Sequence, residues 1–303
     1  IIFSQVMLMN CGTTTNHLPT RPSGASHVTA DSEVRNAVIR QTREYARRAL
    51  PTIQQYLANH QNRLMLAVVD GSIARNLSDS FSHDIDVFGI TIPYPFTPLL
   101  PYDTPARKQQ AIPVAEDVYV DFSLHTISDF FGSVLSGKVP FIEKVYTARQ
   151  FSFFDNNFIL SVFQEIRKAP LDYFPIQQAL FSTEKILGAN VKRLSSGTND
   201  AEKAKARKNI ATALFYKDWL IRLPDDKDVY YHLDRSLYRD VRRGILGENE
   251  LKELLQSARQ EITKEREAMS EMFSTNPKKI NQMDFEVARF MLEQQLDIIN
   301  RKG

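Results

Sequence analysis

The most constraining feature of this sequence is an apolar run that ends abruptly in a polar turn. Residues 63–69 read RLMLAVV, and Asp70-Gly71-Ser72 follows directly. A short apolar run bounded by a glycine turn is typical of a buried strand. Its six apolar residues are far fewer than the roughly 20 that a membrane-spanning helix needs. The run therefore predicts a buried strand with a sharp turn at its end.

Two more strands and a series of helices complete the predicted elements. Residues 84–92 (DIDVFGITI) and 117–124 (DVYVDFSL) alternate between polar and apolar side chains, as half-buried strands do. The proline-rich stretch 93–113 predicts a loop, and Pro51 is expected to interrupt or restart a helix over 31–60. Apolar spacing predicts further helices at 126–137, 140–148, 156–168, 175–196, 200–222, 233–244, 248–272 and 281–300.

This order of elements predicts an α+β fold: a small α/β domain with a short mixed sheet, followed by an all-α helical domain. The chain has 303 residues, which corresponds to about two domains at roughly 150 residues each. We expect a flexible N-terminal arm over 1–31, a catalytic α/β domain over 32–150 and a helical domain over 151–303.

Composition excludes several classes of protein. Hydrophobic residues make up 43% and charged residues 24%, as in globular proteins. The net charge of +2 provides no global field for nucleic acid. Cys11 is the one cysteine, which excludes an intramolecular disulfide and a multi-cysteine zinc site. A free thiol and the lack of a long apolar segment favour a cytoplasmic protein with no membrane partner.

Three aspartates form the candidate metal site. Asp84 and Asp86 are two residues apart in a predicted strand, so both carboxylates point to one face. Asp121 in the next strand is favoured over Asp117 as a third carboxylate. Clustered carboxylates repel, by roughly 4 kcal/mol at about 4 Å and an effective dielectric of 20, so a cation or protons must neutralise them. Oxygen ligands without His or Cys favour Mg²⁺ or Mn²⁺.

The turn before these strands is a candidate phosphate site. Glycine allows a tight turn at Gly71, where backbone amides and the Ser72 hydroxyl can face an anion. A phosphate cradle beside a divalent-metal site is the equipment for nucleotidyl transfer.

The same residues resemble a known family. Gly71-Ser72, eleven residues and then Asp84-Ile85-Asp86 resemble the signature of the DNA polymerase β-like nucleotidyltransferase superfamily. The similarity to predicted nucleotidyltransferases of bacteria and phages extends over roughly residues 60–270. It includes, besides Asp121, the segments Phe130-Phe131, Leu135 to Pro140, Phe141-Ile142-Glu143, Lys208-Asn209, Trp219-Leu220 and Arg242 to Leu246.

The resemblance implies a role for each candidate residue. Asp84, Asp86 and Asp121 would bind metal, and Asp121 would also help to activate the nucleophile. Gly71 and Ser72 would cradle the phosphates. Arg75 is either a phosphate contact or a surface residue, and Lys208 either steers the triphosphate or lies on a solvated helix face. The candidate site residues are therefore Asp84, Asp86 and Asp121 as catalytic residues and metal ligands, and Gly71, Ser72, Arg75 and Lys208 as nucleotide-binding residues.

The implied activity is metal-dependent transfer of NMP from an NTP to a hydroxyl group, with release of pyrophosphate. Mg²⁺ or Mn²⁺ would be the cofactor, the NTP (ATP among them) the donor, and RNA, a protein or a small molecule the acceptor. Two alternatives remain open. Departures from the family at Ile73, Asn76, Thr212 and Phe215 also fit a degenerate member that binds a nucleotide or a partner. An Asp-x-Asp motif is also used by nucleotide-sugar glycosyltransferases.

Overall fold

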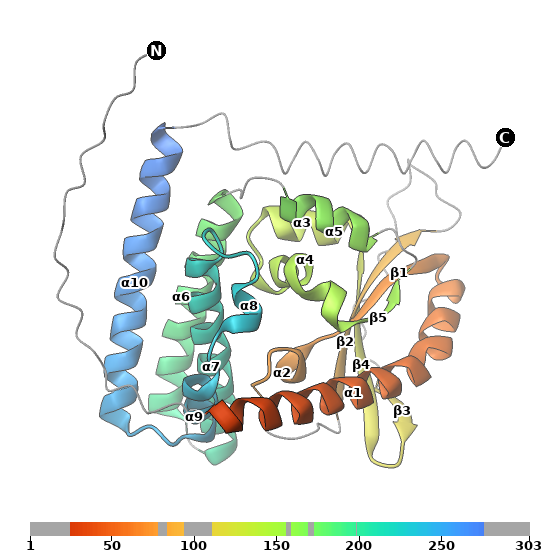
Figure 1. Ribbon diagram of the computed structural model, residues 1–303, viewed down its shortest axis with the longest axis horizontal. Coiled ribbons are helices and arrows are strands. Elements are labelled where there is room, and N and C mark those ends of the chain that lie inside the picture. Colours follow the sequence, from red (N-terminus) through yellow and green to blue (C-terminus); the bar gives the residue numbers. More distant parts are fainter. Residues whose placement is uncertain are drawn as a thin grey trace.

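A computed structural model describes residues 25–77, 84–93, 111–155, 159–168, 173–197 and 199–275. The helices and strands follow one another in a mixed order (Figure 1). In chain order they are α1 (Ala25–Asn59), β1 (Asn62–Val69), α2 (Gly71–Ala74), β2 (Asp84–Pro93), β3 (Ala111–Ala115), β4 (Val118–Thr126), α3 (Ile127–Leu135), α4 (Val139–Phe151), β5 (Ser152–Asp155), α5 (Ile159–Lys168), α6 (Tyr173–Ser196), α7 (Asp200–Arg222), α8 (Val229–His232), α9 (Ser236–Arg243) and α10 (Glu248–Thr275).

The strands form one mixed sheet in the order β3-β4-β2-β1-β5. β2 and β4 are parallel, whereas the other neighbours are antiparallel. Since β1 and β2 run in opposite directions, the end of β1 lies beside the start of β2, where Val69 pairs with Val87. The predicted α+β class with a short mixed sheet is confirmed.

The two faces of the sheet are covered by different helices. On one face, α1 contacts all five strands, with Tyr56 edge-on to Phe122 of β4 at 5.7 Å between ring centroids. The residues that alternate with Phe122 point the other way, and there His125 stacks on Phe88 of β2 at 4.7 Å. Phe141 of α4 packs edge-on against both rings. The second face is therefore covered by α3 and α4 over the later part of β2 and β4.

The long helices α6, α7 and α10 stand side by side, apart from the sheet (Figure 1). One continuous core of buried side chains nevertheless runs from Ile39 in α1 to Met269 in α10. Trp219 of α7 lies in that core, with ring contacts to Tyr146 of α4 and Tyr230 of α8. Packing of this kind joins the helices of the second half to those that cover the sheet. The predicted domain boundary at residue 150 stays a prediction.

Several boundaries differ from the sequence-based ones. The interval 93–113 is not all loop, because β3 begins at Ala111 and includes Pro113. Proline is tolerated there because β3 is an edge strand, where one side of the backbone needs no partner. β5 has four residues and gives little alternation signal. The helix predicted over 233–244 is the shorter α9, and α8, which ends just before residue 233, was not predicted.

The N-terminal helix is also longer than expected. α1 begins at Ala25, inside the arm predicted over 1–31, and continues through Pro51 without interruption. Burial of Ala46, Ala49 and Ile53 against the sheet stabilises the helix on both sides of the proline. Cys11 and the helix predicted over 281–300 lie outside the described residues. Among the helices that are described, none is both long and apolar enough to cross a membrane.

Phe130 of α3 offers a test of the core on the second face. Its side chain is fully buried and contacts Phe88, Phe131, Phe141 and Phe163. Phe130→Ala should lower the free energy of unfolding in urea by about 3–5 kcal/mol, because it leaves a cavity among rings that already pack closely. Ile245→Ala is the control, since that side chain is 62% exposed and its loss should cost less than about 0.5 kcal/mol. Equal effects of the two substitutions would contradict this description of the core.

Candidate active site

Two predicted metal ligands lie side by side on the sheet. Asp86 of β2 pairs with Asp121 of β4 in the parallel register, so both residues occupy the same face of strands about 4.8 Å apart. This is the face that α3 and α4 cover further along. Asp84 lies two residues before Asp86 on the same face, beside Tyr119, and is exposed. The structure thus brings Asp86 and Asp121 together and places Asp84 at the start of the same row.

Asp117 lies elsewhere. It was expected on the same strand face as Asp121, but β4 begins one residue later, at Val118. Asp117 instead occupies the β3–β4 turn with a φ of 57°, a left-handed conformation that Asp tolerates better than most residues. The structure therefore supports the preference for Asp121 as the neighbour of Asp86.

Gly71 lies against the Asp86 carboxylate. The Asp70 backbone N–H donates to the Asp86 carbonyl at 2.8 Å and so holds the end of β1 against β2. Gly71 follows with a φ of +75°, and a Cβ at this position would overlap with Asp86 Oδ2. Glycine is required here for two reasons, the backbone conformation and the close approach of the carboxylate.

Burial and the charges of neighbouring residues shift the pKa of Asp86. Burial raises the pKa of Asp86, and the charges of Asp70 and Asp121 raise it further, whereas Lys208 and Arg75 act in the opposite direction. The net result is a raised pKa. Lys208 of α7 is thus close enough to influence Asp86 electrostatically, although it is more than a hundred residues away in sequence. Lys208 is exposed, and a cation whose charge acts on Asp86 suits a ligand that carries phosphate and metal together.

The Gly71-Ser72 turn leads into a short helix and then folds back. Ser72 is half-buried, and its carbonyl accepts from the Leu77 N–H at 2.9 Å. Ile73 is buried, which explains why an apolar residue is suitable directly after the Gly-Ser pair. The predicted contact of Ser72 with phosphate stays a prediction.

Arg75 is not on the surface, which was one of its two interpretations. Its Nη2 lies 2.7 Å from Glu143 Oε2 and 3.0 Å from Asp70 Oδ1. Lys144 bridges the same two carboxylates, 2.6 Å from Asp70 Oδ1 and 3.2 Å from Glu143 Oε2. We call these four residues the buried charge network. The observed partners of Arg75 are therefore the carboxylates of Asp70 and Glu143. Its predicted contact with phosphate stays a prediction.

Two tyrosines complete the coordination of Glu143. The Tyr216 hydroxyl of α7 donates to Oε2 at 3.0 Å, and the Tyr230 hydroxyl of α8 donates to Oε1 at 2.9 Å. The Glu143 side chain has no exposed surface. A fully buried carboxylate is tolerated because two cations and two hydroxyls surround it. Glu143 therefore connects the turn after α2 with α4, α7 and α8.

Burial and charge act in opposite directions within the network. Burial alone would raise the pKa values of Asp70 and Glu143, but Lys144 and Arg75 outweigh it and lower both. The pKa of Arg75 is raised because the two carboxylates and two tyrosines overcome the cost of burying its charge. Burial also raises the pKa values of Tyr216 and Tyr230, and the Glu143 charge adds to this effect. Both tyrosines thus stay protonated and remain hydrogen-bond donors.

Side chains from α8, from α9 and from the segment between them also contact the backbone carbonyls of the turn after α2. The Tyr230 hydroxyl lies 3.4 Å from the Ala74 carbonyl, and Arg235 Nε donates to the Arg75 carbonyl at 3.3 Å. Arg242 Nη1 donates to the Leu77 carbonyl at 3.1 Å. Sequence reasoning associated Arg242 with the family resemblance but gave no function to Tyr230 or Arg235. Tyr230 lies in the short helix α8 and Arg235 just before α9, and neither sequence context reveals which distant carbonyl the side chain meets.

The donor atoms at the site suit a divalent cation. Asp86 and Asp121 adjoin each other, and hard cations such as Mg²⁺ prefer carboxylate oxygens, with water and substrate phosphates as further ligands. Among the described residues, no three His, Cys, Asp or Glu side chains are arranged to hold a metal ion together. The predicted ligand roles of Asp84, Asp86 and Asp121 therefore all stay predictions.

Comparison with known proteins finds a structural similarity but no similarity in sequence to a family or curated protein. No protein-family model matches the chain, and no curated protein matches it. Among solved structures, it is similar to the crystal structure of a nucleotidyltransferase-like protein from Exiguobacterium sibiricum 255-15, with 15% sequence identity and a TM-score of 0.29. The match covers 80% of this chain and 79% of that protein.

The buried charge network should dominate stability. Glu143→Gln should lower the free energy of unfolding by about 3 kcal/mol or more, because Arg75 and Lys144 lose a buried counter-charge. Glu165→Gln is a matched control, since Glu165 is 62% exposed and pairs with Lys168 on the surface. Its loss should cost less than about 0.5 kcal/mol in the same urea titration.

The stability of wild type and of Glu143→Gln should also depend differently on pH. Asp70 and Glu143 have lowered pKa values in the folded state, so their stabilisation is present above the ordinary values of 3.8 and 4.5 and is lost as pH falls below them. Wild type should therefore lose stability on acidification more steeply than Glu143→Gln. Parallel acid profiles would contradict a stabilising network.

Asp86 should have the opposite effect on stability. A carboxyl group with a raised pKa in the folded state costs stability once pH exceeds its unfolded value, which is 3.8. Asp86→Asn should therefore raise the melting temperature at pH 7, and this gain should disappear as pH falls below that value. Melting curves recorded from pH 3 to pH 8 would check it. A lower melting temperature for the variant at pH 7 would show that Asp86 stabilises the fold.

Proposed function

We propose that the chain is a nucleotidyltransferase, which transfers NMP from an NTP to a hydroxyl group and releases pyrophosphate. The observation that carries the proposal is the in-register pair Asp86 and Asp121, with Gly71 against the Asp86 carboxylate and the charge of Lys208 acting on it. The Gly-Ser and Asp-x-Asp spacing of the sequence supports the same reading.

Each residue has a separate task in this proposal. Gly71 lets the chain turn sharply against the Asp86 carboxylate, so that the Ser72 hydroxyl and backbone amide can face a phosphate. Lys208 interacts with the negative charge of the β- and γ-phosphates. Because Lys208 comes from α7 and Gly71 from the start of α2, directly after β1, the nucleotide would lie between the sheet and the helices that follow it.

The reaction forms a bond between the acceptor oxygen and the α-phosphorus and breaks the bond from that phosphorus to the bridging oxygen of pyrophosphate. Asp121 accepts the proton of the acceptor hydroxyl, directly or through water. Asp86 and Asp121 would hold Mg²⁺ or Mn²⁺, which when bound neutralises charge on the phosphates and favours the ionised acceptor. Lys208 stabilises the charge that develops on pyrophosphate as it leaves.

A binding module without catalysis is the second candidate. The lack of a three-ligand cluster among the described residues favours it. Two of the departures from the family pattern also occupy positions in the core, since Ile73 is buried and Phe215 packs against Tyr230 and Tyr238. Such a protein would bind NTP without consuming it.

Incubation with α-³²P-labelled NTPs and Mg²⁺ or Mn²⁺ tests the proposal. Pyrophosphate release and transfer of label to an added RNA, cell-extract or small-molecule acceptor pool are measured together. Asp86→Asn and Asp121→Asn should each lower the rate by about 100-fold or more, as loss of a group that stabilises the transition state does. Lys208→Gln should lower kcat/KM by about tenfold or more, as loss of one charge-assisted contact does.

Two controls make the result specific. Asp117→Asn changes a carboxylate in the β3–β4 turn and should leave the rate unchanged, and Lys205→Gln changes an exposed cation on α7. NTP binding by calorimetry with no pyrophosphate release in any condition would favour the binding module. Equal rates in wild type and Asp86→Asn would contradict both the proposed reaction and its site.

A further inference from the structure

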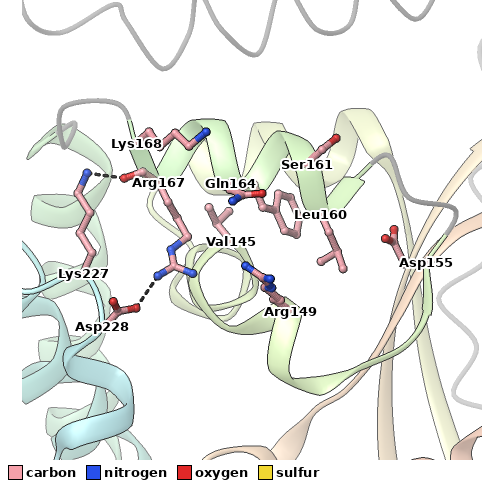
Figure 2. Close-up of a pocket in the computed structure, with 11 residues that line it drawn as sticks. Val145, Arg149, Asp155, Leu160, Ser161, Gln164, Arg167, Lys168, Lys227 and Asp228 are labelled. Carbon is pink, nitrogen blue, oxygen red and sulfur yellow. Dashed lines mark hydrogen bonds and ion pairs between the residues drawn. The ribbon is translucent and has the colours of Figure 1, made fainter.

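A cavity lies between α4, α5 and the segment that joins α7 to α8 (Figure 2). Its volume is about 600 Å³, within the roughly 300–1,000 Å³ of small-molecule sites. Val145, Leu160 and Phe163 supply an apolar wall. The charged lining contains four basic residues and two acidic ones: Arg149, Arg167, Lys168, Lys227, Asp155 and Asp228. The cavity is therefore large enough for a small organic molecule and carries an excess of positive charge.

Some of these cations have structural tasks. Arg167 pairs with Asp228 at 2.5 Å, and Lys227 Nζ donates to the Arg167 carbonyl at the end of α5. Lys168 pairs with Glu165 at the surface. Burial lowers the pKa of Lys227, and the charge of Arg167 adds to this effect. The protein thus keeps two cations, Arg167 and Lys227, close to each other at the cavity.

Arg149 and Gln164 have no such task. Both side chains line the cavity and are exposed (Figure 2), and among the described residues neither makes a hydrogen bond or an ion pair. A cation near the end of α4 is favoured by the helix dipole, but the dipole does not explain why an amide and a second arginine face the same space. A guanidinium, an amide and a further guanidinium together match the oxygens of a phosphate group.

We infer that this cavity binds a phosphorylated small molecule, with its phosphate at Arg149, Gln164 and Arg167 and its apolar part against Val145, Leu160 and Phe163. The site is separate from Asp86 and Asp121, since none of the residues around those carboxylates lines it. The inference is independent of the proposed nucleotidyl transfer. It would hold equally for a protein without enzymatic activity.

Calorimetric titration of the full chain with phenyl phosphate and with inorganic phosphate tests the inference. EDTA is present and chloride is matched, so that metal-dependent binding at Asp86 does not contribute. Phenyl phosphate should bind at a ratio of one per chain and more tightly than inorganic phosphate, because its ring buries apolar surface. Arg149→Gln should weaken binding by about tenfold or more, as expected for one charge-assisted hydrogen bond.

Matched variants separate this cavity from other cationic sites. Arg193→Gln removes the same charge from an exposed position on α6 and should leave the affinity unchanged. Lys208→Gln should also leave it unchanged, whereas a loss in Lys208→Gln but not in Arg149→Gln would place the ligand at the candidate active site. Lack of phenyl phosphate binding at about 10 mM, the weak end of small-ligand affinities, would overturn the inference. Equal losses in Arg149→Gln and Arg193→Gln would overturn it too, because they indicate general charge attraction.

Discussion

The structure depends on the buried carboxylate of Glu143. This one side chain accepts hydrogen bonds from Tyr216 and Tyr230 and pairs with Arg75 and Lys144. Its partners come from the turn after α2, from α4, from α7 and from α8, so elements far apart in sequence must all be in place before its charge is compensated. A partly assembled network would leave a buried charge uncompensated, which costs several kcal/mol. The network therefore favours one arrangement of the helices relative to the sheet.

The candidate active site adjoins this network through Asp70 and Gly71. Asp70 belongs to the network, and its backbone N–H also holds the strand that carries Asp86. Gly71, the next residue, lies against the Asp86 carboxylate. The network stabilises the fold, whereas the raised pKa of Asp86 indicates a carboxylate that costs stability. Perturbed groups of this kind concentrate at functional sites, where a ligand supplies the missing compensation.

The sequence predicts the parts of this fold that depend on local pattern. The alternation around Asp86 and Asp121 identifies β2 and β4, and Gly71 identifies the turn. β3 is missed because Pro113 argues against a strand unless an edge position is known, and β5 because four residues give no periodicity. The network around Glu143 is missed because its partners Arg75 and Tyr216 are 68 and 73 residues away from it in sequence. Long-range ion pairs leave no local signal.

A crystal structure with a non-hydrolysable NTP and Mn²⁺ tests the central claim most directly, because anomalous scattering locates the metal independently of the nucleotide. We expect Mn²⁺ in contact with Asp86 and Asp121, phosphates beside Gly71, and Lys208 within hydrogen-bond distance of the β- or γ-phosphate. A nucleotide bound elsewhere, or Mn²⁺ absent from the two carboxylates while the nucleotide is present, would contradict it.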